Sequence, residues 1–338
     1  MTVFLSDNVA GAHPAIMEAI AEANSGAAAP YGDDVWSATL DRAFSTLFER
    51  EVAVIPCVTG TAANALALSL LLDPTESALV LAGSHVYGDE CNAPELFSGG
   101  ARLVPLAGEG GKLRPVDLLP ELARRGDRHS AQPTAVSIAQ CTETGRVYRL
   151  DELAGLAAAA RDNGLSVHMD GARFANAVAA LGCSPAEATW KAGVDVLSFG
   201  ATKNGCLGAE AVVLFDPALA GKARFRAKRA GQLLSKMRFL SAQLLAHVEN
   251  GLWLDCARHA NARALELEAS LGSAGIRVPA PPDANIVFAE PDADQSARLS
   301  AAGLAGYESK GTMRFCTSWQ TSEADIAALA SCLAGDPT

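Results

Sequence analysis

Residues 165–204, LSVHMDGARFANAVAALGCSPAEATWKAGVDVLSFGATKN, decide the fold of this chain. Two apolar runs of strand length, Leu165–Asp170 and Val194–Phe199, flank an Ala-rich stretch that favours a helix. One strand–helix–strand step of a parallel sheet needs about thirty residues or more, which this stretch supplies. Asp170 ends the first strand and Lys203 follows the second. We therefore expect both side chains at the carboxyl edge of the sheet, where open α/β sheets bind their ligands.

The same alternation of strands and helices extends through most of the chain. Further strands are expected at Glu51–Cys57, Ser77–Ala82, Arg102–Leu106, Pro133–Gln140 and Ala211–Phe215. Helices are expected at Gly60–Leu72 and from Asp151 to Gly164. Strands that are apolar on both faces and alternate with helices indicate a mostly parallel sheet covered by helices on both sides. The predicted fold class is therefore α/β.

The character of the sequence changes near residue 250. A long helix is expected at about residues 252–272, then short strands at Ile276–Val278, Ala284–Ala289 and Met313–Thr317, and a final helix from Ser322. At 338 residues the chain exceeds the roughly 250–300 residues at which one hydrophobic core usually stops growing. We expect a large domain over residues 1–250 and a small α+β domain over residues 251–338.

Composition and charge exclude several classes of protein. A formal net charge of −11 argues against a nucleic-acid partner, which needs a basic face. The amino terminus does not have the pattern of a signal peptide, and no apolar run is long enough to span a bilayer. The eight cysteines are scattered without a C-x-x-C pair, so we expect reduced thiols, a cytoplasmic location and no metal site. The low charged fraction of 19% hints at surface buried in an oligomer.

Asp170 and Lys203 together have the chemistry of a pyridoxal 5'-phosphate (PLP) site. A lysine forms a Schiff base with this cofactor, and a carboxylate beside the pyridine nitrogen keeps that nitrogen protonated, so that the ring can accept electrons. As an isolated pair, the same residues are also typical of a capped turn and a surface lysine. A nicotinamide dehydrogenase is disfavoured because no glycine fingerprint follows an early strand.

Two further segments suit such a site. Thr59–Asn64 (TGTAAN) follows a strand and opens a helix, where free N–H groups and the helix dipole attract an anion. An ordinary strand-to-helix turn with a threonine cap is the alternative. His85 follows the strand at Ser77–Ala82, a place where PLP enzymes commonly stack a ring on the cofactor. A single histidine is more often a structural residue.

Across nearly its whole length, the chain resembles the low-specificity L-threonine aldolases of the aspartate-aminotransferase-like PLP superfamily. The matching segments are SDN (6–8), YGDD (31–34), GTAAN (60–64), SHV (84–86), DEC (89–91), HMDGAR (168–173), SFGATKN (198–204), KMR (236–238) and MRF (313–315). HMDGAR and TKN are highly specific when they occur in this order and spacing. Many relatives have Ser-Lys-Gly where this chain has Thr202-Lys203-Asn204. The resemblance implies a fold-type-I enzyme with PLP as its cofactor.

The resemblance also implies roles for individual residues around the cofactor. Lys203 would hold PLP covalently, Asp170 would pair with its ring nitrogen, and His85 would stack on its ring. The full cofactor-binding set that it implies is Gly60, Thr61, His85, Asp170, Arg173, Thr202, Lys203, Lys228 and Arg238. Lys228 and Arg238 would reach the phosphate of a neighbouring subunit, or else they are solvated charges on a helix.

The substrate-binding residues implied by the resemblance come from three distant segments. Ser6, Arg173 and Arg314 would hold the substrate carboxylate, because the planar fork of an arginine donates two parallel hydrogen bonds to such a group. Residues 1–25 would thereby contribute to the active site. A base must take the proton of the β-hydroxyl group. His85, His129 or a bound water remain open for this task, and His85 is the first choice.

The implied reaction is the retro-aldol cleavage of L-threonine, L-allo-threonine and related β-hydroxy amino acids to glycine and an aldehyde. This is the reaction of a carbon–carbon lyase, with Lys203, His85 and His129 as its catalytic residues. Alternatives on the same fold are a phenylserine-type aldolase, a β-eliminating lyase or an aminotransferase, and a non-catalytic binding protein is a remote one. The family also implies a homo-oligomer, a dimer or tetramer with shared active sites, and no nucleic-acid or membrane partner.

Overall fold

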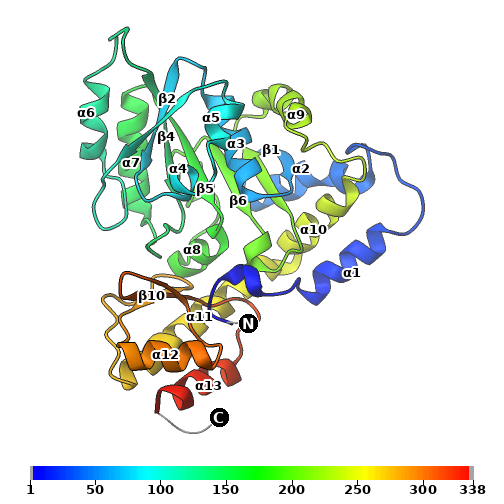
Figure 1. Cartoon of the computed structure of the whole chain (residues 1–338). Helices are drawn as coiled ribbons and strands as arrows, with labels where there is room; N and C mark the ends of the chain where they lie inside the picture. Colours follow the sequence, from blue (N-terminus) through cyan, green and yellow to red (C-terminus); the bar gives the residue numbers. More distant parts are fainter. Residues whose placement is uncertain (1–2, 335–338) are drawn as a thin grey trace.

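The computed structural model describes residues 3–334, and its centre is a seven-stranded sheet (Figure 1). The strands lie in the order β1-β7-β6-β5-β4-β2-β3. Their bounds are β1 Ala53–Cys57, β2 Glu76–Leu81, β3 Arg102–Leu106, β4 Gln132–Ala139, β5 Ser166–Gly171, β6 Val196–Gly200 and β7 Glu210–Leu214. Only β7 runs antiparallel to its neighbours β1 and β6. The predicted mostly parallel sheet is confirmed.

Helices cover both faces of this sheet, because successive strand residues point to opposite sides. One face packs on α3, α5 and α9, and the other on α2, α7, α8 and α10, while α1 packs against α10. The bounds are α1 Pro14–Ala23, α2 Val35–Leu47, α3 Gly60–Leu71, α4 His85–Gly88, α5 Ala93–Phe97, α6 Leu119–Leu122, α7 Leu150–Asp162, α8 Phe174–Leu181, α9 Ala220–Arg229 and α10 Arg238–Val248. Among residues 3–334, no helix is both long and apolar enough to cross a membrane.

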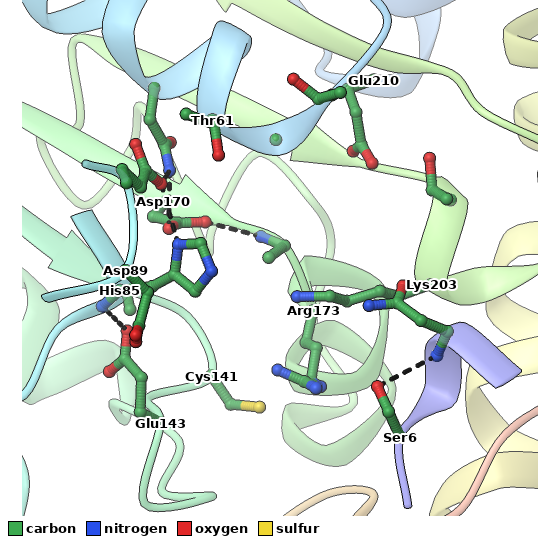
Figure 2. A pocket seen from close by; sticks show the side chains of 18 of the residues that line it. Ser6, Thr61, His85, Asp89, Cys141, Glu143, Asp170, Arg173, Lys203 and Glu210 are labelled. Atoms are coloured by element: carbon green, nitrogen blue, oxygen red, sulfur yellow. Dashed lines mark hydrogen bonds and ion pairs between the residues drawn. The ribbon is translucent and has the colours of Figure 1, made fainter. Parts of the chain in front are cut away.

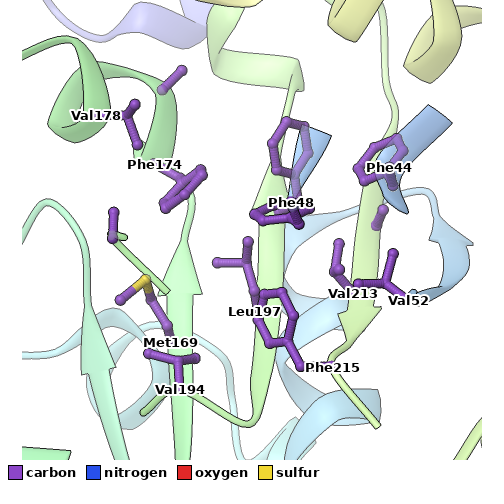
Figure 3. Packing of buried hydrophobic residues seen from close by; sticks show 14 of the residues in the cluster. Phe44, Phe48, Val52, Met169, Phe174, Val178, Val194, Leu197, Val213 and Phe215 are labelled. Atoms are coloured by element: carbon purple, nitrogen blue, oxygen red, sulfur yellow. The ribbon is translucent and has the colours of Figure 1, made fainter. Parts of the chain in front are cut away.

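Aromatic side chains on the second face fix the ends of the two central strands (Figure 3). Phe199, near the end of β6, meets Phe44 of α2 edge to face at 5.2 Å between ring centroids. Phe174, the first residue of α8, contacts Phe199 in the same way at 6.1 Å. Both rings are fully buried. The polar turns that follow β5 and β6 are therefore attached directly to fully buried aromatic side chains of the core.

A second, three-stranded antiparallel sheet lies below the first in Figure 1. Its order is β8-β10-β9, and its elements are β8 Ile286–Ala289, β9 Tyr307–Ser309, β10 Thr312–Cys316, α12 Ala293–Ala301 and α13 Glu323–Ala334. α11 (Leu252–Ser273) begins in the core of the large sheet and ends in the core of the small one. The division into domains at residue 250 stays a prediction, since a single helix belongs to both cores.

The expectation of a strand at Ile276–Val278 is wrong. Arg277 forms only an isolated bridge with Glu290. Pro279 follows at once, and a proline has no N–H group for a sheet ladder and restricts the residue before it. β9 and α12 were not expected, because β9 is only three residues long and exposed, and α12 is short and mostly polar.

Gly200 allows the ends of β5 and β6 to approach each other closely. A Cβ atom at this position would lie 2.6 Å from both the Cα and the carbonyl oxygen of Ala172. We expect Gly200→Ala to lower the free energy of unfolding by about 1–3 kcal/mol, as overpacking does. Chemical denaturation measures this change. Gly155→Ala is the control, because nothing lies within 4 Å of that added Cβ and alanine favours the helix α7. Equal stability of the two variants would contradict the expectation.

Candidate active site

A cavity of about 500 Å³ opens at the carboxyl edge of the large sheet (Figure 2). Its walls come from the turns after β1, β2, β4, β5 and β6, the first residue of β7, the amino-terminal segment and β10. The predicted residues that line it are Ser6, Gly60, Thr61, His85, Asp170, Arg173, Thr202, Lys203 and Arg314. Segments more than 300 residues apart in the sequence therefore meet at the place expected for a ligand in this class of fold.

Asp170 lies at the end of β5 with both carboxylate oxygens held by neutral donors. Oδ1 accepts a hydrogen bond from the backbone N–H of Ala172 (2.9 Å), and Oδ2 accepts one from Nδ2 of Asn64 on α3 (2.8 Å). The residue is only 7% exposed, and within the described part of the chain no cation forms an ion pair with it. A buried carboxylate without a partner of opposite charge is costly. A cationic group of a ligand would therefore bind favourably beside it.

Lys203 stands on the neighbouring strand end, in the 3-10 turn Thr202–Asn204 that follows β6. Hydrogen bonds hold the residues on both sides of Lys203 in place. Asn204 donates from Nδ2 to the carbonyl oxygen of Trp253 (2.7 Å), and Oγ1 of Thr202 accepts from the N–H of Ala209 (3.2 Å). The asparagine that replaces the glycine of many relatives thus connects the lysine turn to α11.

The amino terminus of α3, which carries Thr61, forms a further wall of the cavity (Figure 2). Thr59 caps this helix, and its Oγ1 accepts from the N–H of Ala62 (3.1 Å). The first N–H groups of a helix have no partner within the helix, and the helix dipole favours an anion there. Gly60, Thr61 and Thr202 line this corner, which we call the anion cradle. The arrangement suits the phosphate group expected from the sequence.

His85 lies opposite Lys203 and is half-buried. Its Nδ1 is 2.9 Å from Oε1 of the buried Glu90, and this hydrogen bond raises the pKa of His85. Its backbone N–H donates to Oε1 of Glu143 (2.7 Å). Burial raises the pKa of Glu143, whose second oxygen is buried without a hydrogen-bond partner in the described part of the chain. Two carboxyl groups therefore fix both the ring and the backbone of this histidine.

Arg173 is aimed at the cavity by a buried ion pair with Asp7. Its Nε and Nη2 donate to the two oxygens of Asp7 at 2.7 and 2.9 Å. Burial alone would raise the pKa of Asp7, but the charge and hydrogen bonds of Arg173 outweigh this and hold it below its usual range. Phe4 packs in the small core and the backbone of β10 bonds to it, so Ser6 and Asp7 are held against the cavity. Arg314 of β10 lines the same region, and its buried Nε has no partner within residues 3–334.

Removal of Asp7 should reveal the strength of this buried pair. We expect Asp7→Ala to lower the free energy of unfolding by about 3–5 kcal/mol, because it leaves a buried guanidinium without its partner. Glu49→Ala breaks the ion pair between Glu49 and Lys191, in which both side chains are exposed, and should leave the free energy of unfolding nearly unchanged. Thermal and denaturant unfolding of the two variants would test the contrast. Similar losses in both would show that the Asp7–Arg173 pair behaves as a surface pair.

Three predicted residues do not line the cavity of their own chain. His129 is exposed in the loop before β4, whereas Ala139 at the end of β4 lines the cavity. A strand of eight residues is about 26 Å long, so His129 lies at the opposite edge of the sheet. Lys228 is exposed over the ring of Tyr31 (5.1 Å), and Arg238 donates to the carbonyl oxygen of Gly26 (3.1 Å). Their roles stay predictions, and each requires a second copy of the chain.

Other residues in the cavity wall, and Asp7 behind Arg173, were not predicted to act in the site. Asn64 and Asp7 lie in segments that carried the resemblance, but nothing in the sequence showed that they hold Asp170 and Arg173. Glu143 follows β4 at the carboxyl edge, so its position in the sheet was a usable signal. Glu90 also lies in a segment that carried the resemblance, DEC (89–91), whereas Glu210 offered no signal. The burial of both side chains depends on the packing of other segments.

The donor set of the cavity fits PLP. Three groups meet the needs of a pyridinium nitrogen, an aldehyde and a phosphate, respectively: a fixed carboxylate without a counter-ion within residues 3–334, an amine in the turn after the next strand, and the anion cradle. The volume of the cavity is within the range of small-molecule sites, about 300–1,000 Å³. No residue in the described lining contradicts this cofactor except Glu210, a buried carboxyl group near the anion cradle.

Comparison with known proteins agrees with this geometry. A family model described as beta-eliminating lyase matches residues 4–294. A low specificity L-threonine aldolase of Pseudomonas sp. (strain NCIMB 10558) is 44% identical over 331 residues, which cover 97% of this chain and 96% of that protein. A solved structure of Leishmania major threonine aldolase matches with a TM-score of 0.91 at 30% identity and covers 99% of each chain.

A more distant solved structure, of a protein named SPT with PLP as internal aldimine, shares the fold. It is 18% identical with a TM-score of 0.70 and covers 98% of this chain and 86% of that one. The cofactor of the present chain is PLP. Identity of 44% along almost the entire length, and a fold that superposes from end to end, show that the chain belongs to the threonine aldolases within the beta-eliminating lyase family.

Proposed function

We propose that this enzyme is a carbon–carbon lyase that cleaves L-threonine, L-allo-threonine and related β-hydroxy-α-amino acids to glycine and an aldehyde. The observation that carries the proposal is the buried Asp170, which has no counter-ion among the described residues and faces a cavity shared with Lys203, in the turn after the neighbouring strand. Membership of the threonine aldolases supports the choice of reaction.

PLP, when bound, supplies a conjugated ring that accepts the electrons of a bond broken at the substrate Cα. Asp170 keeps a proton on the ring nitrogen, because its fixed carboxylate favours the charged form of that nitrogen. Asn64 and the N–H of Ala172 prevent the carboxylate from turning away. Lys203 holds the cofactor and later delivers a proton to Cα to complete glycine. In this proposal Asp170 supports the acceptance of electrons by the cofactor ring, and Lys203 transfers the proton to Cα.

Ser6, Arg173 and Arg314 bind the substrate carboxylate in this proposal. They line one side of the cavity, and Arg173 is fixed by Asp7 before any ligand arrives. Holding the carboxylate would fix rotation about the N–Cα bond of the substrate and orient its Cα–Cβ bond for cleavage. This positioning would select carbon–carbon cleavage over loss of the α-proton.

His85 is the base that we propose for the β-hydroxyl proton. When Nδ1 donates to Glu90, the neutral ring presents the lone pair of Nε2 to the cavity. The same carboxylate makes the ring more basic, because it stabilises the charged form. His129 of a neighbouring copy is the alternative, since it cannot reach the cavity of its own chain.

Product analysis tests the proposed reaction. The purified enzyme with PLP should release acetaldehyde and glycine in equal amounts from L-threonine and L-allo-threonine, and benzaldehyde and glycine from phenylserine. The family model that matches this chain is described as beta-eliminating lyase, which makes β-elimination the second candidate. That reaction would yield a keto acid and ammonia without glycine. Keto acid as the only product would replace the aldolase proposal.

We also propose that the enzyme works in the cytoplasm as a homotetramer whose subunits share active sites. Lys228 and Tyr31 sit together on the surface, away from the cavity of their own chain, and the large side chains of Val35 and Phe225 are exposed nearby in the sequence. A neighbouring copy would cover these groups and bring Lys228 and Arg238 to its anion cradle. Light scattering gives the number of subunits, and a monomer with full activity would refute this arrangement.

A further inference from the structure

Glu210 is a buried carboxyl group in the cavity wall that the proposed reaction does not use. It is the first residue of β7, which lies between β1 and β6. Its backbone pairs with Cys57 of β1 on one side and Gly200 of β6 on the other. β1 leads into the amino terminus of α3, and β6 leads into the turn of Thr202 and Lys203. The position of β7 therefore places Glu210 between the two segments that form the anion cradle.

The contacts of Glu210 hold its side chain in this position. Oε2 accepts a hydrogen bond from the backbone N–H of Ala201 (3.0 Å), and the residue is 7% exposed. The ionisable groups that face it are the ammonium group of Lys203 and the thiols of Cys57 and Cys206. Both thiols are neutral, because burial raises the pKa of Cys57 to about 12 and that of Cys206 well above its usual value. Lys203 is thus the only nearby charge within the described residues.

A charged carboxylate at this place would oppose the ligand that the cradle binds. Two negative groups that share a poorly solvated site cannot both keep their charge at low cost. Burial raises the pKa of Glu210 to about 7, although the hydrogen bonds of Thr202 and Ala201 and the charge of Lys203 lower it in part. Arrival of a phosphate adds negative charge and raises this pKa further. The neutral carboxyl group then has a proton to donate.

We propose that Glu210 binds the cofactor phosphate in its neutral form, as a hydrogen-bond donor, and that cofactor binding takes up one proton at this residue. This inference rests on the proposed position of the phosphate at the anion cradle. It makes the affinity for the cofactor fall as the pH rises above neutrality. Glutamine is the matched replacement, because its amide donates a hydrogen bond and carries no charge at any pH.

The test uses pyridoxamine 5'-phosphate, which carries the same phosphate but no aldehyde to react with Lys203. Its dissociation constant is measured by fluorescence titration near pH 6.5 and near pH 8.5. Between these values the affinity of the wild-type protein should fall about tenfold more than that of Glu210→Gln, as expected for the coupled uptake of one proton. The ionisable groups of pyridoxamine 5'-phosphate titrate equally in both experiments, so their effect cancels when the wild type is compared with Glu210→Gln. Equal pH dependence of the two proteins would overturn the proposal.

Asp195→Asn is the matched control. Asp195 is another carboxyl group whose pKa burial raises, and it accepts the N–H of Val167 (2.7 Å) at the opposite edge of the sheet. This variant should keep the wild-type pH dependence. If it behaved like Glu210→Gln, the effect would arise from general charge and not from the cradle.

Proton uptake gives a second measurement that does not need a folded variant. Calorimetry near pH 8 in buffers of different ionisation enthalpy should show about one more proton taken up with pyridoxamine 5'-phosphate than with pyridoxamine. No difference between these ligands would overturn the proposal even if Glu210→Gln does not fold.

If neither PLP nor pyridoxamine 5'-phosphate binds at any pH, the proposed function fails as well. Binding with equal pH dependence in wild type and Glu210→Gln removes only the role of Glu210.

Discussion

Replacement of Lys203 with alanine is expected to reduce the release of acetaldehyde from L-threonine by at least roughly 10³-fold, within the range found for loss of a positioned acid–base group. The variant loses both the covalent attachment of PLP and the amine that transfers the final proton. The visible absorbance of the protein-bound imine should disappear at the same time. Steady-state rates and absorption spectra of the purified variant measure the two effects.

The control for Lys203 is Lys191→Ala, which removes an exposed lysine far from the cavity and should leave the spectrum unchanged. Addition of a small primary amine to Lys203→Ala should restore part of the rate, since it can act in place of the missing side chain. A variant that keeps both the chromophore and the rate would show that another lysine holds the cofactor. That result would remove the basis of the proposed site.

Asp170→Asn should lower kcat by roughly 10²–10³-fold, the range found when one preorganised electrostatic group is removed. The asparagine keeps the shape of the side chain but cannot stabilise a positive charge on the ring nitrogen. Binding of PLP should survive, because the lysine and the anion cradle remain. Comparison of kcat with the dissociation constant of PLP separates the electronic role from a loss of binding.

A cofactor analogue sharpens the test of Asp170. PLP methylated on its ring nitrogen carries a permanent positive charge, so it should raise the activity of Asp170→Asn. The wild-type enzyme should gain nothing from it. Asp170→Glu keeps the charge but displaces it from Asn64, and its activity should lie between those of wild type and Asp170→Asn. An Asp170→Asn variant with the kcat of wild type would show that the carboxylate has only a structural role.

The sequence predicted the strand ends well because hydrophobic runs and the length of a strand–helix–strand step are local properties. Asp170, Lys203 and the TGT segment each follow an apolar strand, and parallel strands bring such positions to one edge. The match to the observed β5 and β6 is within two residues at each boundary. Local patterns failed at Ile276–Val278, where the following proline prevents a ladder that the hydrophobic residues alone would favour.

Contacts between distant segments were beyond the reach of the sequence. The ion pair of Asp7 with Arg173 joins positions 166 residues apart, and no spacing rule connects them. In the sequence, Glu210 is a polar residue directly before an apolar strand. It is buried because β7 lies between β1 and β6 in the sheet, and the sequence does not show this order. The expected place of His129 came from resemblance alone. The direction of β4 shows that the residue serves another copy of the chain or none.

The shared helix α11 has a mechanical consequence for the enzyme. Its 22 residues form a helix about 33 Å long. The start of this helix is hydrogen-bonded to the turn that carries Lys203, because Nδ2 of Asn204 donates to the carbonyl oxygen of Trp253. Its other end is embedded among the side chains under the small sheet, which carries Arg314. A displacement of the small sheet would therefore be transmitted along α11 to the turn that carries Lys203. We expect Arg314, which we propose to bind the substrate carboxylate, and Lys203 to move together when the substrate binds.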